Sequence, residues 1–239
     1  MTAIGVIPAR GGSQRLPGKN LLSVLGKPLI AYTIEAALHA SLLSRVLVST
    51  DHPEIAKVAR RFGAEVVIRP EELATADAPI DDSLRHVVKH LRTNGDSPID
   101  IVVLMQANNP IRKKGEIDEV VRRVIASPSA TAVATAFKIS QRPEWTKKVI
   151  NEETMEIGPF LDPGTKYRMQ DLPDLYLLDG SIMAIRADVL EKTAGDRRVH
   201  AYLGDRVIIL AHESKYAVEI DDSEDVELAE FYLSRQRGA

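Results

Sequence analysis

The sequence predicts an α/β fold in which a mostly parallel sheet is flanked by helices, and two observations lead to this prediction. Short runs rich in Val and Ile alternate along the chain with amphipathic segments. Such alternation is typical of units in which parallel strands are joined by helices. The length of 239 residues suits one large domain with a substantial core, so we expect a single domain over residues 1–239.

The individual elements follow from the same patterns. Apolar runs predict strands at residues 4–8, 45–49, 65–68, 99–105, 131–137, 175–185 and 207–210. Amphipathic segments predict helices at residues 29–39, 54–62, 80–92, 115–126 and, in an acidic segment, 223–235. The second of these helices shows the pattern well, because Ile55, Val58, Ala59 and Phe62 recur at helical spacing after a proline.

Residues 138–173 depart from this regular pattern. The segment contains several prolines, scattered charges and Trp145, which is the single tryptophan of the chain. Long excursions from an α/β core usually serve as lids, binding loops or interfaces. We therefore expect an insertion that projects from the sheet.

Composition excludes several classes of protein. The net charge of −3 gives no reason to expect a nucleic acid or an anionic membrane as a partner. The absence of cysteine excludes disulfides and thiolate metal sites. We find neither a long apolar run nor a signal peptide, and the expectation is a cytoplasmic protein.

The loop that follows the first expected strand is the most informative feature. Residues 10–20 contain three glycines together with the cations Arg10, Arg15 and Lys19. Glycines allow backbone N–H groups to approach a ligand, and cations offset negative charge. Ligands of parallel sheets bind at the carboxyl ends of the strands, where this loop falls. A polyphosphate site is the functional interpretation, and a charged surface turn is the alternative.

The loop lacks two common nucleotide-binding signatures. It has neither the GxGxxG fingerprint of dinucleotide-binding folds nor the Gly-Lys-Ser/Thr ending of a P-loop. An NAD-dependent oxidoreductase is therefore disfavoured.

Two further groups of polar residues are candidates for a site. Glu219 and Asp221 alternate, so on a strand they would share one face and could bind a cation such as Mg²⁺. A solvated acidic face before the last helix is the alternative. Gln106 and Asn108 end a buried strand, and their amides suit sugar hydroxyls, although a polar turn would use the same residues.

Five motifs, in order along the chain, resemble those of the cytidylyltransferases that act on nonulosonic acids, the family of CMP-sialic acid synthetases. The first is Ile-Pro-Ala-Arg-Gly-Gly-Ser at residues 7–13, closed by Lys19-Asn20. The others are Arg69-Pro70 with Ala76-Asp77 and Asp81-Asp82-Ser83; residues 105–112; residues 168–173 with 179–182; and Val218-Glu219-Ile220-Asp221. The resemblance extends along nearly the whole chain.

This resemblance implies a Rossmann-like fold and a reaction in which CTP and a 2-keto sugar acid give a CMP-sugar and pyrophosphate. It implies catalytic roles for Arg10, Lys19 and Asp221, and Mg²⁺ bound by Glu219 and Asp221. The implied nucleotide-binding residues are Ala9, Arg10, Gly11, Gly12, Ser13, Lys19, Asn20, Arg69 and Ser83. The implied substrate-binding residues are Gln106, Asn108, Arg168, Gln170 and Asp179. The insertion at residues 138–173 would mediate a homodimer.

Two alternatives stay open from the sequence. Arg15-Leu16-Pro17-Gly18-Lys19 is similar to the related synthetases for 3-deoxy-manno-octulosonic acid, so the acceptor can be either type of acid. The second alternative is a catalytically weak nucleotide-binding domain with the same fold, and the presence of Lys19 and Asp221 argues against this alternative.

Overall fold

The computed structural model describes residues 1–162, 164, 168, 170 and 172–237, and its centre is a sheet of seven strands. These are β1 (Ala3–Pro8), β4 (Arg45–Thr50), β5 (Glu65–Ile68), β6 (Ile101–Leu104), β7 (Ala132–Lys138), β10 (Tyr176–Arg186) and β11 (Val207–His212). Their order is β11-β7-β10-β6-β1-β4-β5. Only β10 runs antiparallel to its neighbours β6 and β7 in this sheet, so the predicted mostly parallel sheet is confirmed.

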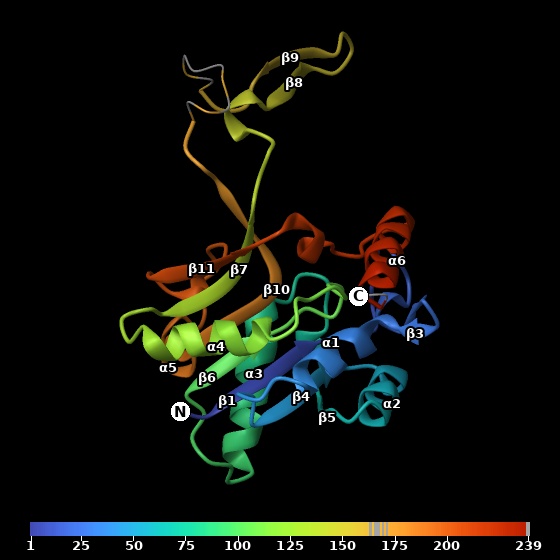
Figure 1. Cartoon of the computed structure of the whole chain (residues 1–239), viewed down its shortest axis with the longest axis vertical. Helices are drawn as coiled ribbons and strands as arrows, with labels where there is room; N and C mark the ends of the chain where they lie inside the picture. Colours follow the sequence, from blue (N-terminus) through green and yellow to red (C-terminus); the bar gives the residue numbers. More distant parts are fainter. Residues whose placement is uncertain (163, 165–167, 169, 171, 238–239) are drawn as a thin grey trace.

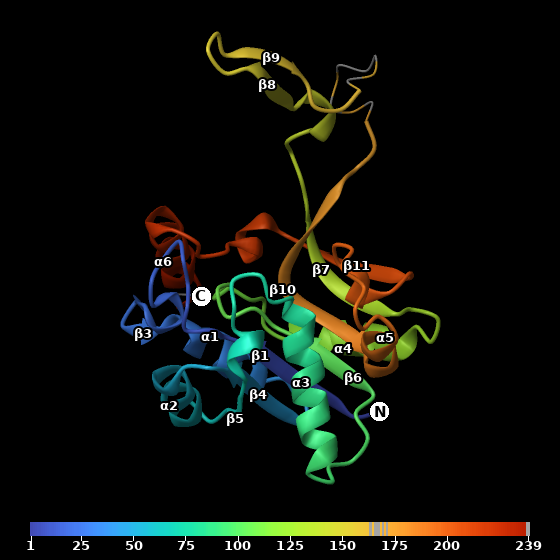
Figure 2. The same ribbon diagram turned by 180° about the vertical axis from the view of Figure 1, so that it is seen from behind.

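Helices cover both faces of the sheet, as Figures 1 and 2 show from opposite sides. One face carries α1 (Leu29–Leu38), α2 (Pro53–Arg61) and α4 (Glu116–Ala126), and the other carries α3 (Ile80–Thr93) and α5 (Ala187–Lys192). Alternate residues of β1 enter the two cores: Ile7 packs with the first group of helices and Val6 with the second. This alternation shows that β1 is covered by helices on both of its faces.

A third apolar cluster holds the C-terminal part of the chain beside the sheet. The last helix, α6 (Ser223–Arg237), and the small hairpin of β2 (Ser23–Val24) and β3 (Lys27–Pro28) contribute to this cluster. Ile220 is fully buried in it with Leu233 and Ile111. The acidic motif around Ile220 is thereby fixed to the body of the protein.

The predicted insertion projects from the body as an arm (Figures 1 and 2). β7 and β10 lead into it, and β8 (Lys147–Asn151) and β9 (Glu156–Pro159) form an antiparallel hairpin within it. The hairpin exposes apolar side chains such as Ile150 and Ile157, which are more than half exposed. The composition of this segment did not predict the hairpin.

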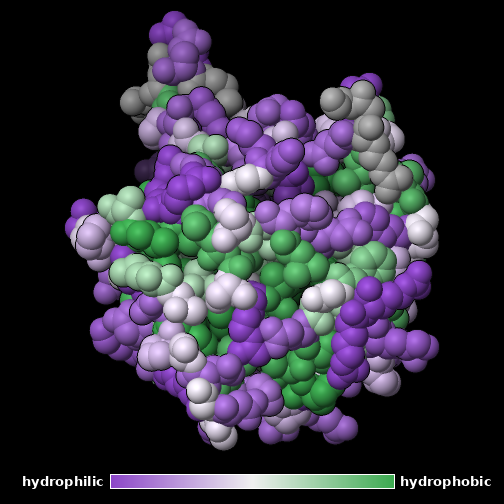
Figure 3. Space-filling model, turned by 60° about the horizontal axis from the view of Figure 1, so that its bottom comes forward, coloured by the Kyte–Doolittle hydropathy of each residue, from purple (hydrophilic) through white to green (hydrophobic). Residues whose placement is uncertain are grey.

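Among the described residues, short 3₁₀ turns lie at Lys19–Leu21, Glu71–Leu73, Pro143–Trp145, Ala201–Leu203 and Ser214–Ala217. Residues 218–220 form no strand, in contrast to the strand considered for Glu219 and Asp221. Figure 3 brings the lower end of Figure 1 forward and shows hydrophobic residues gathered toward the middle of a largely hydrophilic surface. Across the part of the chain described, no helix combines the length and apolar character needed to cross a bilayer.

Candidate active site

The glycine-rich loop is tied to the neighbouring strand by its backbone. Ala9 donates its N–H to the carbonyl of Ser49 at 2.9 Å, and the N–H of Gly11 donates to Asp51 Oδ1 at 3.0 Å. The amide of Asn20 donates to the carbonyl of Arg10 at 3.0 Å, which closes the loop on itself. These contacts hold the loop across the carboxyl ends of β1 and β4, where the sequence predicted a phosphate site.

Two glycines of the loop have distinct reasons to be glycine. A Cβ atom at Gly11 would lie 2.5 Å from the ring of His52, so no larger residue fits there without a shift. Gly18 has a φ of 70°, in the left-handed region that glycine adopts without strain, and it precedes the turn Lys19–Leu21. Both positions shape the loop so that Lys19 is directed inward.

Lys19 and Asp221, 202 positions apart in the chain, form an ion pair of 2.7 Å. Arg15 pairs with the other oxygen of Asp221 at 2.8 Å. Burial alone would raise the pKa of Asp221, but these two cations bring it below its ordinary value. The structure thus brings together two motifs that the sequence assigned to one site.

A cavity of about 300 Å³ lies over this cluster. The loop lines one part of it through Arg10, Ser13, Gln14, Arg15, Lys19 and Asn20, and other elements contribute Ile80, Gln106, Asn108 and Asp221. Most of the sequence-predicted residues of the loop and of the third motif therefore meet in one depression.

The acidic motif offers a site for a hard cation. Ile220 is buried and donates its N–H to the carbonyl of Asn108 at 2.9 Å, with Glu219 and Asp221 on either side of it. Burial and the nearby charges of Asp221 and Asp179 raise the pKa of Glu219. A bound cation would relieve the repulsion between these carboxylates, which is the charge environment that Mg²⁺ prefers. Among the described residues, no group of three or more acidic or histidine side chains forms a metal site, so a cation here would need ligands from a substrate.

Arg10 and Arg69 lie along an adjoining cavity of about 250 Å³, which shares Pro8, Arg10 and Ile80 with the first. Arg69 is buried and donates to the carbonyl of Ser49 at 2.6 Å and to Ser83 Oγ at 2.9 Å. Burial lowers the pKa of Arg69. Ser83 is 1% exposed, so the structure places it behind Arg69 and not on the wall of the cavity where a nucleotide would touch it.

The third motif is braced by a residue to which the sequence analysis gave no role of its own. Arg112 is buried and donates to the carbonyls of Gln106, Asn109 and Ser181 at 2.9, 2.5 and 3.1 Å. Burial lowers the pKa of its guanidinium to about 10. Arg112 belongs to the motif at residues 105–112, but a single sequence does not indicate that this arginine is buried and bound to carbonyl groups.

Asp179, the last predicted sugar contact, is also buried. Its carboxylate accepts from Thr135 Oγ1 at 2.6 Å and from the N–H of Ser181 at 2.8 Å, and it contacts His212 Nε2. Its side chain is 0% exposed, so in this geometry it has no surface for a sugar. We infer that Asp179 acts through its buried neighbours instead.

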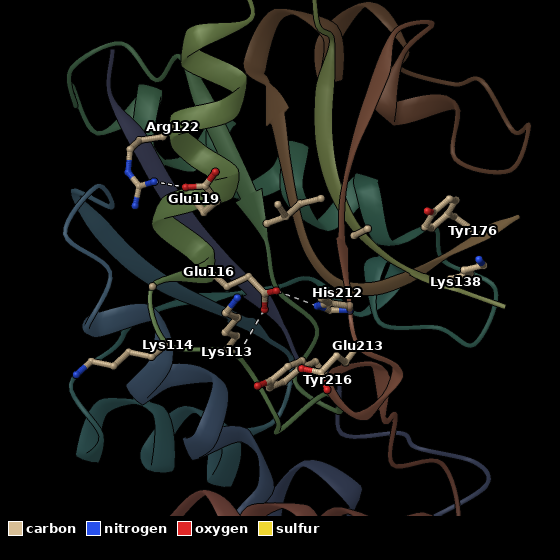
Figure 4. Close-up of a pocket in the computed structure, with 13 residues that line it drawn as sticks. Lys113, Lys114, Glu116, Glu119, Arg122, Lys138, Tyr176, His212, Glu213 and Tyr216 are labelled. Atoms are coloured by element: carbon tan, nitrogen blue, oxygen red, sulfur yellow. Dashed lines mark hydrogen bonds and ion pairs between the residues drawn. The ribbon is translucent and has the colours of Figure 1, made fainter. Parts of the chain in front are cut away.

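His212 joins Asp179 to Glu116 on α4, and Figure 4 shows the contact with Glu116. Burial alone would lower the pKa of His212, but hydrogen bonds to Asp179 and Glu116 outweigh it and raise the pKa to about 9. The motifs of the sequence assign no role to this histidine. No local spacing reveals it, because its partners lie 33 and 96 positions away.

Arg168 and Gln170 lie in the arm, in the chain between β9 and β10. Both are exposed, and neither lines the two cavities around the loop. The neighbouring Met169 and Asp171 of that predicted motif lie outside the described residues. The structure therefore does not bring this motif to the loop of the same chain.

Comparison with known proteins shows to which protein family a chain with this site belongs. A family model described as Cytidylyltransferase matches residues 4–155, more than half of the chain. The chain belongs to the cytidylyltransferase family. The resemblance expected from the five motifs is thereby confirmed, and the protein is a nucleotidyltransferase that uses CTP to activate a sugar acid.

The names of individual relatives divide between two classes of acceptor, the nonulosonic acids and 3-deoxy-manno-octulosonate. This chain is 36% identical over 183 residues to the CMP-N,N'-diacetyllegionaminic acid synthase of Legionella pneumophila. The matched region covers 76% of this chain and 77% of that protein. This chain is 28% identical over 259 residues to the 3-deoxy-manno-octulosonate cytidylyltransferase of Bdellovibrio bacteriovorus. The matched region covers 99% of both chains.

A solved structure resembles the cytidylyltransferase over its whole length. It is a CMP:2-keto-3-deoxy-manno-octonic acid synthetase complexed with CTP, with a TM-score of 0.73 over 99% of this chain and 100% of that one. At 22% identity this likeness concerns the fold, and it confirms the α/β architecture expected from the sequence.

Proposed function

We propose that this cytidylyltransferase transfers CMP from CTP to a nonulosonic acid of the sialic type and releases pyrophosphate. The observation that supports the proposal most is the meeting of the cationic loop, Asp221 and Gln106 in one cavity. A triphosphate, a cation and a polyhydroxylated acceptor each find matching groups there.

The cations of the loop are placed to bind the triphosphate. Arg10, Arg15 and Lys19 all line the cavity, and Arg15 is 77% exposed, so it can turn from Asp221 to a phosphate. Guanidinium groups bind phosphate oxygens in a two-pronged manner, whereas an ammonium acts as a point charge. Together they would neutralise the charge that accumulates on the departing pyrophosphate.

Glu219 and Asp221 are the residues that would hold Mg²⁺, and the phosphates of CTP would supply further ligands. When bound, the ion supplies charge stabilisation to the phosphates during transfer. Lys19 keeps Asp221 ionised and oriented, because the two side chains already form an ion pair without a ligand.

The transfer itself is a displacement at the α-phosphorus. The anomeric oxygen of the sugar acid forms a bond to the α-phosphorus, and the bond from that phosphorus to the bridging oxygen breaks. The electron pair of the broken bond leaves with pyrophosphate, and the hydroxyl proton passes to solvent. Gln106 and Asn108, which line the cavity, would orient the acceptor through its hydroxyl and acyl groups.

We further propose a homodimer in which the arm of one chain reaches the site of the other. The hairpin exposes Ile150, Ile157 and Phe160 at 56, 59 and 62%, which suits burial against a second copy. Arg168, exposed on the same arm, would then approach the carboxylate of the acceptor in the partner's cavity. A cytoplasmic location stays a prediction.

The octulosonic acid is the second candidate acceptor, and a specific observation favours it. The relative that uses this type of acid matches 99% of both chains, whereas the legionaminic acid synthase matches about three quarters. The higher identity of the latter, 36% against 28%, supports the nonulosonic acid.

The test is release of pyrophosphate in the presence of Mg²⁺, measured with each of CTP, UTP, ATP and GTP and a panel of 2-keto sugar acids. We expect release with CTP and a nonulosonic acid. Release with the octulosonic acid alone would transfer the proposal to the second candidate. No release from CTP with any acid would contradict both.

A further inference from the structure

Three distant segments of the chain meet at His212, the last residue of β11. Its ring is 3% exposed, and its Nδ1 lies 2.9 Å from Glu116 Oε1 at the start of α4. Its Nε2 contacts the carboxylate of Asp179 on β10. The ring forms part of the wall of a third cavity, of about 790 Å³, which Figure 4 shows together with Lys113 and Tyr216.

The charges around this ring explain why it is held between two acids. Glu116 is 4% exposed and the side chain of Asp179 is 0% exposed, and buried carboxylates are costly unless they are paired and hydrogen-bonded. An imidazolium donates one N–H to each of them. The other charged or titratable groups near the ring or its two partners are Arg112, Lys113, Glu213, Tyr216 and Glu219.

Asp179 transmits this arrangement to the turn that follows it. Its Oδ1 accepts from the N–H of Ser181 and from Thr135, which fixes residues 179–181 where the pairing of β10 with β7 shifts register. Within this turn Gly180 has a φ of 69°. The position of the turn therefore depends on the carboxylate that His212 contacts.

The turn at residues 179–181 lies against Gln106. A Cβ atom at Gly180 would lie 2.3 Å from Gln106 Nε2, so the two residues are in close contact. Gln106 lines the cavity beside the glycine-rich loop, on a different part of the surface from the cavity at His212. A continuous chain of contacts thus runs from His212 through residues 179 and 180 to Gln106.

We propose that His212 is a positioning residue, which holds the turn at residues 179–181 and so sets the place of Gln106 in the acceptor part of the site. This inference rests on the proposed function for the identity of the acceptor, but the chain of contacts does not depend on it. Without an imidazolium, two buried carboxylates are left without a cation between them, and the turn moves away from Gln106. The loop that binds the triphosphate takes no part in this chain.

The kinetic test compares His212→Gln with His39→Gln, a matched change at an exposed histidine. We expect H212Q to raise KM for the sugar acid by about tenfold, as loss of a placed hydrogen bond would do, with KM for CTP within about twofold. The double variant H212Q/D179N removes the charges of His212 and Asp179, leaves that of Glu116, and keeps an acceptor oxygen for Ser181, so it should recover part of the lost affinity. An equal rise in both KM values, or no recovery, would overturn the positioning role.

A spectroscopic test needs no turnover. In the ¹⁵N-labelled protein at neutral pH, both ring nitrogens of His212 should carry protons, and the side-chain amide resonance of Gln106 should shift in H212Q but not in H39Q. A neutral His212, or an unshifted Gln106, would overturn the proposal even if the enzyme proves active. If H212Q does not fold, Glu116→Gln serves in both tests with a smaller expected effect. An enzyme inactive with every acid, but with the expected resonances, would mean that the proposed acceptor is wrong while the network stands.

Discussion

The glycine-rich loop and Gln106 face the same cavity but are held in place by different means. The loop is tied to the adjacent strand by backbone hydrogen bonds to Ser49 and Asp51, and it closes on itself through Asn20. Gln106 instead lies against a turn that depends on His212 and on two buried carboxylates.

Under the proposed function, the loop is the nucleotide part of the site, whose shape is set locally, and Gln106 belongs to the acceptor part, whose shape is set by distant residues. A change in a buried partner of the acceptor part should alter selection of the acid and spare binding of CTP. The following experiments test that separation, from the largest expected effect to the smallest.

Asp221→Asn should have the largest effect, because this carboxylate lies at the point where the two parts meet. It pairs with Lys19 and Arg15 and is a proposed ligand of Mg²⁺. We expect kcat to fall by about 10²–10³-fold, as for the loss of one preorganised charge contact, with folding intact. Steady-state kinetics check this, and binding of Mn²⁺ gives a readout without turnover. Glu224→Gln, at an exposed neighbouring acid, is the control; wild-type turnover in D221N would contradict the role.

The stability of the protein should depend on pH through His212. Its pKa is about 9 in the folded protein against 6.5 for an unperturbed histidine, so its stabilising contribution is complete below pH 6.5 and is lost as pH rises through 9. A shift of this size corresponds to about 3 kcal/mol. Urea unfolding at neutral pH and near pH 10 should show the loss in the wild type and not in H212Q. Parallel behaviour of the two proteins would contradict a buried imidazolium.

Gly180→Ala should disturb the acceptor part through shape alone. The added Cβ would clash with Gln106, and the φ of 69° at residue 180 is unfavourable for alanine. We therefore expect the free energy of unfolding to fall by about 1–2 kcal/mol and KM for the sugar acid to rise. Gly195→Ala is a matched control, since Gly195 has a φ of 82° and nothing within 4 Å of its Cβ position. The control should show the strain without the change in KM. Equal KM values for the acid in both variants would argue against the contact with Gln106.

Ile157→Asp should have the smallest effect on the folded chain, because the hairpin packs little against the body. We expect the mass in light scattering to change from dimer to monomer while the chain stays folded. Val199→Asp introduces the same charge at a residue that is 86% exposed outside the arm, and should leave the dimer intact. A monomeric wild type would remove the basis of the homodimer proposal.

The two parts also differ in how far the sequence could predict them. The strand, the loop and Lys19 lie within twenty residues, and the resemblance of two motifs assigned Lys19 and Asp221 to one site. The ion pair between them was not predicted. The roles predicted for Ser83 and Asp179 depended on exposure, which a sequence does not report, and both side chains are buried. His212 and Arg112 could not be assigned, because their partners come from distant elements that only the folded sheet brings together.

The central claim is that one cavity joins a nucleotide to a sugar acid, and ³¹P NMR of the wild-type reaction tests it most directly. With CTP, Mg²⁺ and a nonulosonic acid, we predict that the α-phosphorus appears in a phosphodiester and the β and γ phosphorus atoms appear in pyrophosphate. Neither product should form without the acid. Formation of inorganic phosphate as the first product, or consumption of CTP without the acid, would contradict it.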